Sequence, residues 1–256
     1  MKIAVCIKQV PTREWQPRLN DTGRWIREQD ASFEMNEPDA YALEEALRLR
    51  EKHGGEVVVC SAGPARVTQV LREALARGAD RAIHVQDDGL ASADAFVVAA
   101  ALASAMKDDR FDLVMTGLQS DDQGFAQTGV VLAERLGVCH ATIVVEVQVN
   151  GAALRVKREL EGGWFQWVGL PTPAVLTIQS GINQLRYATL KGIMAAKKKE
   201  IRTSAPAPAP AAPSGQEVVA LALPSKSKKT RLIEGAPADA ARTLVAHLRE
   251  IGRAHV

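Results

Sequence analysis

The stretch GGEVVVCSAGPARVTQVLREALARGADRAIHV, residues 54–85, decides the fold class. Residues 56–60 form a continuous β-branched run, which is expected of a strand covered on both faces. Residues 67–75 then place apolar side chains at helical spacing until Gly78, and residues 81–85 predict a second strand. A strand, a helix and a strand in this order predict two parallel strands joined by a crossover helix.

The same alternation extends in both directions from this unit. A mostly apolar run at residues 2–10 predicts a strand, and Pro38 opens a helix that stops at Gly54. Downstream we expect an Ala-rich helix capped by Ser92 and ending near residue 107, a strand at 112–116, and a helix at 125–136 stopped by Gly137. The chain is therefore predicted to have an α/β fold with a doubly wound, mostly parallel sheet.

The pattern changes after residue 140. Residues 141–149 and 152–160 flank Asn150-Gly151, a tight-turn dipeptide, and predict a hairpin. Gly162-Gly163 predicts a further turn that leads into residues 164–168, and residues 174–179 predict a last core strand. We therefore expect an antiparallel hairpin region appended to the parallel sheet.

The C-terminal part has a different composition. Residues 204–215, SAPAPAPAAPSG, predict a stiff extended tether between an α/β domain (1–203) and a C-terminal arm (216–256). The pattern leaves open whether this extended arm packs on its own domain or on a partner. The arm holds a strand-like segment (217–223), basic residues (Lys226, Lys228, Lys229, Arg231) and a final helix with Leu244, Leu248 and Ile251 on one face.

Composition excludes several functional classes. The 256 residues include 32 Lys plus Arg and 30 Asp plus Glu, a balance that argues against a dedicated nucleic-acid binder. The longest uncharged apolar run, residues 95–106, is too short to insert into a membrane, and the N-terminus does not resemble a secretory signal. Cys6, Cys60 and Cys139 are interpreted as small hydrophobes in a reducing compartment. We expect a soluble, cytoplasmic protein.

The sequence contains no recognisable catalytic or metal-binding motif. GxxxxGK[ST], GxGxxG, CxxC and HExxH are all absent, and the five histidines have no ligand spacing. Adjacent Cys139 and His140 would point apart on a strand, which argues against a metal or nucleophile there. We therefore expect no catalytic residue and no metal, and a binding or carrier protein rather than an enzyme.

The loops that follow the predicted strands indicate a binding site. In open parallel sheets, ligands bind beyond the carboxyl ends of the strands, at the point where the strand order reverses. Residues 6–8, 61–64 and 117–129 (GLQSDDQGFAQTG) lie at such ends. The last loop is polar and enters a helix, whose first N–H groups, flanked by Gln127 and Thr128, suit a phosphate. The alternative is a plain polar loop with a helix cap.

Five ordered blocks resemble the small, β subunit of electron-transfer flavoproteins. VKRELEGGWFQWVGLPTPAVLT, residues 156–177, looks like the signature of that family. The resemblance runs from Met1 to about Lys199. Within the signature, Arg158, Glu161, Gly162-Gly163, Gln166 and Pro173 stand at the expected spacing, and the other blocks are VCIKQV (5–10), Asn36 with ALEEAL (42–47), residues 117–129, and RYATL (186–190) with a Lys-rich helix end.

The resemblance implies a subunit that buries AMP as a structural ligand and pairs with a larger α subunit, which holds most of the FAD. Electrons would pass from a donor dehydrogenase to the FAD and on to a quinone reductase or another acceptor. The NEPD and SDDQ segments are most similar to the forms that serve trimethylamine- or dimethylglycine-type dehydrogenases. By position, the implied AMP contacts are Cys6, Asn36, Glu37, Pro38, Asp39, Ala62, Gly117, Leu118, Gln119, Ser120, Asp121, Asp122, Gln123, Gly124, Phe125, Ala126, Gln127 and Thr128.

Two alternatives to this interpretation remain. The KQVP segment (8–11) is shared with the electron-bifurcating branch of the family, which holds a second FAD in place of AMP, whereas residues 127–129 and the RYATL loop favour the non-bifurcating branch. Residues 8–11 and Arg13 also depart from the flavin-side pattern of many relatives, so a contact with the flavin ring stays open. The other alternative is a stand-alone nucleotide-binding regulatory domain.

The segment after Arg186 is expected to dock the donor. The resemblance aligns Leu190 with a leucine that inserts into a pocket on the donor dehydrogenase, and Lys191 and residues 197–199 surround it with positive charge. On pattern alone, Leu190 could instead cap its short helix against the two apolar residues that follow. The predicted docking residues are Tyr187, Leu190, Ile193 and Met194.

Overall fold

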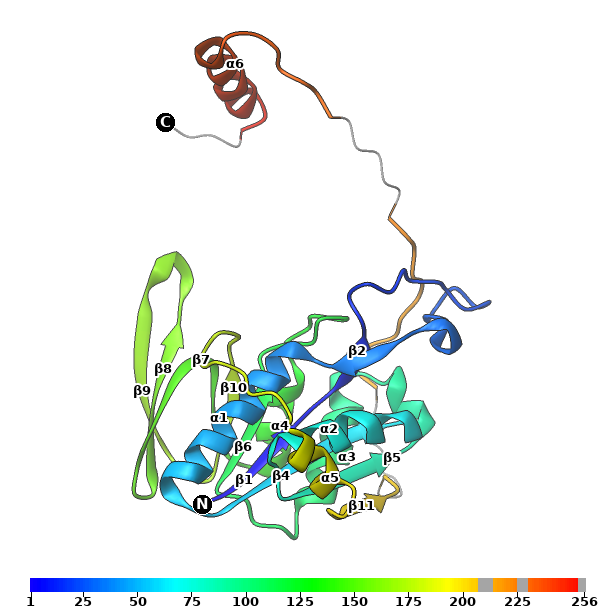
Figure 1. Ribbon diagram of the computed structural model, residues 1–256, viewed down its shortest axis with the longest axis vertical. Helices are drawn as coiled ribbons and strands as arrows, with labels where there is room; N and C mark the ends of the chain where they lie inside the picture. Colours follow the sequence, from blue (N-terminus) through cyan, green and yellow to red (C-terminus); the bar gives the residue numbers. More distant parts are fainter. Residues whose placement is uncertain (207–213, 225–229, 253–256) are drawn as a thin grey trace. The chain divides into compact units, whose positions relative to one another are not determined.

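The computed structural model describes residues 1–206, 214–224 and 230–252 (Figure 1). The chain divides into two units, Met1–Leu221 and Ala222–Val256. The first unit contains a nine-stranded sheet of order β11-β5-β4-β1-β6-β10-β7-β8-β9, and the second contains helix α6 (Pro237–Glu250). Among the described residues, no helix is both long enough and apolar enough to span a bilayer.

The first part of the sheet is parallel. β1 (Lys2–Cys6) lies between β4 (Glu56–Gly63) and β6 (Leu113–Gly117), so the chain first builds outward on one side of β1 and then on the other. The strand order therefore reverses beside β1. The other parallel strands are β5 (Arg81–Gln86), β10 (Ala174–Ile178) and β11 (Ile201–Ser204).

Successive residues of the central strands face opposite sides of the sheet and contribute to two separate hydrophobic cores. Ile3 and Val5 of β1 face a core shared with α1 (Glu37–His53) and α2 (Thr68–Arg77). Ala4 and Cys6 face a second core shared with α3 (Ala95–Met106) and α4 (Thr128–Leu136). The alternation follows from the two-residue period of a strand. Helices therefore cover both faces of the sheet, with α1 and α2 on one of them (Figure 1), and the predicted doubly wound arrangement is confirmed.

The predicted hairpin region is also present. β7 (Cys139–Asn150), β8 (Ala153–Glu159) and β9 (Phe165–Pro171) form an antiparallel flap, and β7 continues the sheet parallel to β10. The turn lies one residue later than predicted, at Gly151-Ala152, because Asn150 pairs with Ala153. Gly151 has φ of 63°, a backbone conformation that favours glycine. Short 3-10 helices lie at Glu28–Asp30, Ala65–Val67, Asp88–Ala91 and Glu161–Gly163, and the short helix α5 spans Leu190–Ala196.

Several predicted element ends are wrong, and three of the errors concern the loops that follow the parallel strands. The strand expected at 2–10 ends at Cys6, and β2 (Gln9–Pro11) pairs instead with β3 (Phe33–Met35), because the N–H of Lys8 leaves the ladder and donates to Asp39 (2.8 Å). Asp94, rather than Ser92, caps α3 by accepting from the N–H of Val97 (3.0 Å). The helix expected from residue 125 starts at Thr128.

The C-terminal prediction is tested only in part. Residues 207–213 of the predicted tether, and Lys226, Lys228 and Lys229 of the basic stretch, lie outside the described residues. The segment 217–223 forms no strand. The predicted boundaries at 203/204 and 215/216 stay predictions.

Candidate functional site

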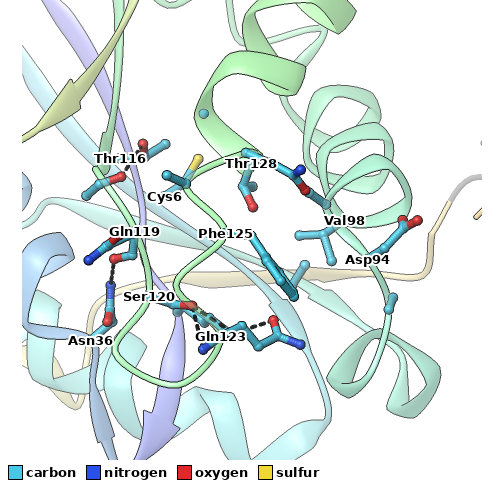
Figure 2. Close-up of a pocket in the computed structure, with 18 of the residues that line it drawn as sticks. Cys6, Asn36, Asp94, Val98, Thr116, Gln119, Ser120, Gln123, Phe125 and Thr128 are labelled. Atoms are coloured by element: carbon cyan, nitrogen blue, oxygen red, sulfur yellow. Dashed lines mark hydrogen bonds between the residues drawn. The ribbon is translucent and has the colours of Figure 1, made fainter. Parts of the chain in front are cut away.

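A cavity of about 450 Å³ opens at the carboxyl ends of β1 and β6, where the strand order reverses (Figure 2). Its volume is within the range of small-molecule sites in proteins. Most of the residues predicted to contact a nucleotide line it. These are Cys6, Asn36, Asp39, Ala62, Gly117, Leu118, Gln119, Ser120, Gln123, Phe125, Ala126, Gln127 and Thr128.

Five predicted contact residues do not line this cavity. Glu37 and Asp121 form ion pairs with Arg13, at the outer side of the loop. The remaining three have structural contacts that account for their positions. Asp122 binds Lys8, Pro38 packs against Gly117, and Gly124 adopts φ of 66° in the turn.

The first turn of α1 fixes the loop that follows β6. Asn36 donates to the carbonyl of Gln119 (3.0 Å) and accepts from the N–H of Asp121 (2.9 Å). Asp39 accepts from the N–H of Gly117 (2.8 Å), and a Cβ at Gly117 would lie 2.6 Å from that same carboxylate oxygen. Glycine is therefore required at the point where β6 enters the loop.

Burial changes the acid–base behaviour of two residues in the cavity wall. It raises the pKa of Asp39 to about 6, although the N–H groups of Lys8 and Gly117 act in the opposite direction. Burial also raises the pKa of the Cys6 thiol well above its usual range. Cys6 is therefore a neutral thiol at neutral pH, and it is not activated as a nucleophile.

The N-terminus of α4 forms the opposite wall. Its cap residue, Gln127, makes no side-chain capping bond, so its side chain satisfies none of the first N–H groups of the helix. A Cβ at Gly129 would lie 2.5 Å from Thr177 and 2.7 Å from Thr116, which shows how closely this first turn packs on β6 and β10. The partial positive charge of the helix terminus is therefore held at the strand ends, where it favours an anion.

The charged side chains around the cavity are largely paired. The Lys8 ammonium lies 2.7 Å from Asp122 Oδ1 and 2.9 Å from Gln123 Oε1. Within the described ranges, no group of three or more His, Cys, Asp or Glu side chains is placed to hold a metal ion. The cavity combines polar loop backbone and a helix terminus with apolar walls from Val98, Leu102 and Phe125.

Comparison with known proteins identifies the family. The electron transfer flavoprotein domain model matches residues 24–209. The chain is 39% identical to "Electron transfer flavoprotein subunit beta" of Methylophilus methylotrophus over 98% of each chain. It is 35% identical to the subunit of that name from Syntrophomonas wolfei, over 100% of this chain and 99% of the relative, and 33% identical to that from Bacillus subtilis, over 90% of each. The chain belongs to the electron transfer flavoprotein beta-subunit family.

Some of the residues that line the cavity of this family member were missed by sequence reasoning. Asp94 caps α3, Val98 lies in its first turn, and residues 216–218 come from beyond the predicted tether. A signal for Asp94 was available, because an Asp immediately before an apolar helix is a strong capping residue. No local pattern marks residues 216–218, since their return to the cavity depends on contacts with residues about 120 positions earlier.

The predicted docking residues of this electron-transfer subunit lie together on and before α5. Leu190 is 78% exposed, and Tyr187, Ile193 and Met194 are exposed as well. The alternative in which Leu190 packs against its own helix does not account for this exposure. The Thr189 hydroxyl caps α5 by accepting from the N–H of Gly192 (3.1 Å).

Proposed function

We propose that this chain is the small subunit of a heterodimeric electron transfer flavoprotein and that it binds AMP in the cavity at the β1/β6 strand ends. The observation that carries the proposal is the α4 N-terminus, which has no side-chain cap and whose first residues, Thr128 and Gly129, line a cavity of about 450 Å³. The phosphate would bind at this terminus, and the nucleoside would contact the apolar walls near Cys6, Ala62 and Val98.

The redox chemistry belongs to FAD, which we assign mainly to a larger α subunit. The residues of this chain bind the nucleotide, maintain the shape of the cavity and present surfaces to other proteins. Neither Asp39 nor Cys6 has a reactive role in this proposal. Asp39 accepts hydrogen bonds from two backbone N–H groups, and Cys6 lines the cavity as a neutral thiol.

The outer strand of the flap is the surface we assign to the α subunit. Trp164, Phe165 and Trp167 are exposed on or beside β9, and Trp164 is 74% exposed. Arg155 and Lys157 hold two of these rings in place, because their cations lie 4.3 Å from the Trp167 ring and 4.2 Å from the Phe165 ring. Large aromatic side chains on an exposed strand are typical of a protein–protein interface. Leu244 and Val245 on α6, with Ile251 immediately after it, form a further exposed apolar set that suits the same partner.

The docking segment, Tyr187 to Met194, is assigned to the donor dehydrogenase. An exposed leucine can fill a pocket on the donor, and Lys191 and Lys197 can speed the encounter with an acidic rim. The resemblance favours a donor of the trimethylamine or dimethylglycine dehydrogenase type. The acceptor would be a quinone reductase or a similar protein.

Nucleotide analysis of the assembled protein tests this function. The chain is co-expressed with the α subunit of its own organism, and the heterodimer is purified, denatured and analysed for released nucleotides. We expect one AMP and one FAD per heterodimer. Two FAD and no AMP would favour the electron-bifurcating alternative. A chain that binds a nucleotide but never associates with the α subunit would favour the regulatory domain.

A further inference from the structure

Residues 214–218 cross the side of the cavity that lies between α3 and α4. We call this segment the strap. Gln216, Glu217 and Val218 line the cavity directly, although more than 85 positions separate them from Thr128 at the start of α4. The strap therefore adds a wall to the cavity that does not come from the loops after β1, β4 and β6.

One carboxylate holds the beginning of the strap. Asp94 Oδ1 accepts from the N–H of Val97 and caps α3, while Oδ2 accepts from the N–H groups of Gly215 and Gln216, the latter at 3.0 Å. The hydroxyl of Ser214 lies 3.1 Å from the same oxygen. In Figure 2, Asp94 lies at the α3 edge of the cavity. Hydrogen bonds to an ionised carboxylate are stronger than those between neutral groups, so this is a firm attachment.

Further contacts position the strap. The backbone of Gly215 lies against the Phe96 ring, because a Cβ at Gly215 would be 3.0 Å from a ring carbon. Within the strap, Glu217 pairs with Arg24 (3.2 Å). Beyond the strap, the N–H of Leu221 donates to the carbonyl of Gly23 (2.8 Å). The strap is thus attached at its beginning, at Glu217, and again three residues beyond its end.

The strap also reaches the proposed phosphate end of the site. The Gln216 side-chain amide donates to the side-chain oxygen of Gln127 (3.4 Å), the residue immediately before α4. A nucleotide whose phosphate binds at the α4 N-terminus would therefore have Gln216 beside its phosphate. Any group attached beyond that phosphate would have to displace the strap.

We infer that the strap selects a nucleoside monophosphate over nucleotides that extend past the first phosphate, and that Asp94 is the positioning residue that holds it closed. This inference rests on the proposed nucleotide site. It adds a specificity element, contributed by the C-terminal segment, to a site otherwise built by the strand-end loops.

The test uses the FAD-containing heterodimer loaded with radiolabelled AMP. Asp94→Asn keeps an oxygen to cap α3, and Asn is as good a cap as Asp, but its amide N–H₂ faces the N–H groups of the strap. Gly215→Val acts from the other side, by pushing the strap away from Phe96. Asp87→Asn is the matched control, because Asp87 caps a 3-10 helix through Gly89 (2.8 Å) and has no strap contact.

Two quantities are measured: the release of AMP into excess unlabelled AMP, and the competition of ADP-ribose against AMP. We expect both strap variants to release AMP about tenfold faster than the unmodified protein. Their preference for AMP over ADP-ribose should fall about tenfold, while Asp87→Asn should match the unmodified protein in both quantities. A preference that is unchanged in both strap variants would overturn the inference. Failure of the unmodified heterodimer to bind AMP would instead overturn the proposed site.

Discussion

Asp39 is a buried acid at the centre of the site. Its two oxygens accept from the N–H groups of Lys8 and Gly117, so one side chain joins the ends of β1 and β6 to the first turn of α1. Burial nevertheless dominates its electrostatics and raises its pKa to about 6, from 3.8. The ionised form is therefore less stable in the folded protein than in the unfolded chain, and folding is favoured by protonation.

The substitution Asp39→Asn should remove this effect of protonation from the pH dependence of the free energy of unfolding. The pKa of the folded state is above that of the unfolded state, so the favourable contribution of Asp39 is fully present below about pH 4 and is lost as pH rises through 6. A pKa that rises from 3.8 to about 6 corresponds to roughly 3 kcal/mol. We expect the free energy of unfolding of the unmodified chain, relative to Asp39→Asn, to rise by up to that amount between pH 7 and pH 4. Urea unfolding of both proteins measures it, and a constant difference would contradict the prediction.

The three cysteines should differ sharply in reactivity. Burial raises the pKa of Cys6 and raises that of Cys60 to about 12, whereas Cys139 is partly exposed. Because the thiolate is the reactive form, we expect one fast-reacting thiol in the folded chain and three after denaturation. Titration with an aromatic disulfide reagent measures this. The fast reaction should disappear in Cys139→Ser, and its persistence there would show that a buried thiol is accessible.

At the scale of the element, α5 is a short helix that presents a cluster of exposed side chains. Arg186, just before the cluster, binds Glu44 at 2.7 Å and Glu51 at 2.5 Å, both on α1. This bidentate attachment fixes the beginning of the segment on the body of the protein. Tyr187 and Leu190 are then held exposed on a rigid base.

Leu190→Ala should weaken docking of the donor dehydrogenase without changing the protein itself. Burial of a leucine side chain stabilises a complex by roughly 1.5–3 kcal/mol, which corresponds to about tenfold to a hundredfold in affinity. AMP content, FAD content and thermal stability should be unchanged, because the side chain is 78% exposed. The measurement is the rate of heterodimer reduction at increasing donor concentration.

Leu232→Ala is the matched control for that experiment, since Leu232 is 81% exposed and lies outside the docking segment. It should leave reduction by the donor unchanged. An unchanged rate of reduction in Leu190→Ala, or a large loss of its thermal stability, would show that Leu190 has a structural role instead.

Element types were predictable from sequence, and element ends were less so. Hydrophobic periodicity identified the parallel strands and the flap, because both patterns are local. The helix expected from Phe125 starts at Thr128 instead, since Ala126 adopts φ of 55° and cannot belong to a right-handed helix. The four-residue edge strand β11 was missed, because its pairing with β5 leaves no local signal.

At the scale of the whole molecule, the cavity joins segments that are distant in the chain. Its walls come from the ends of β1 and β6, from helices α1, α3 and α4, and from the strap. The strand-end loops were predictable from sequence, because the topology of a parallel sheet brings them to one edge. Asp94 could have been predicted as a helix cap, but its contact with Gln216 could not, because the two residues are 122 positions apart.

Removal of AMP should therefore destabilise the whole first unit. A ligand that binds only the folded state stabilises it by about 2.7 kcal/mol at a hundred times its Kd. For a unit of this size, that corresponds to a rise in Tm of about 5–10 °C. Thermal unfolding of nucleotide-free heterodimer in increasing AMP measures the shift, with adenosine, which lacks the phosphate, as the weaker control. A Tm that is independent of AMP would contradict the assignment.

The strap also has a consequence for biosynthesis. Gln127 and Gln216, which meet beside the cavity, are separated by 89 positions. At ribosomal elongation rates, the second residue is added roughly 4–18 s after the first. During that interval the strand-end loops have already been translated, while the side of the cavity facing the strap is still open. On the proposed function, a nucleotide has this route of entry until residues 214–218 have been translated and the strap has formed.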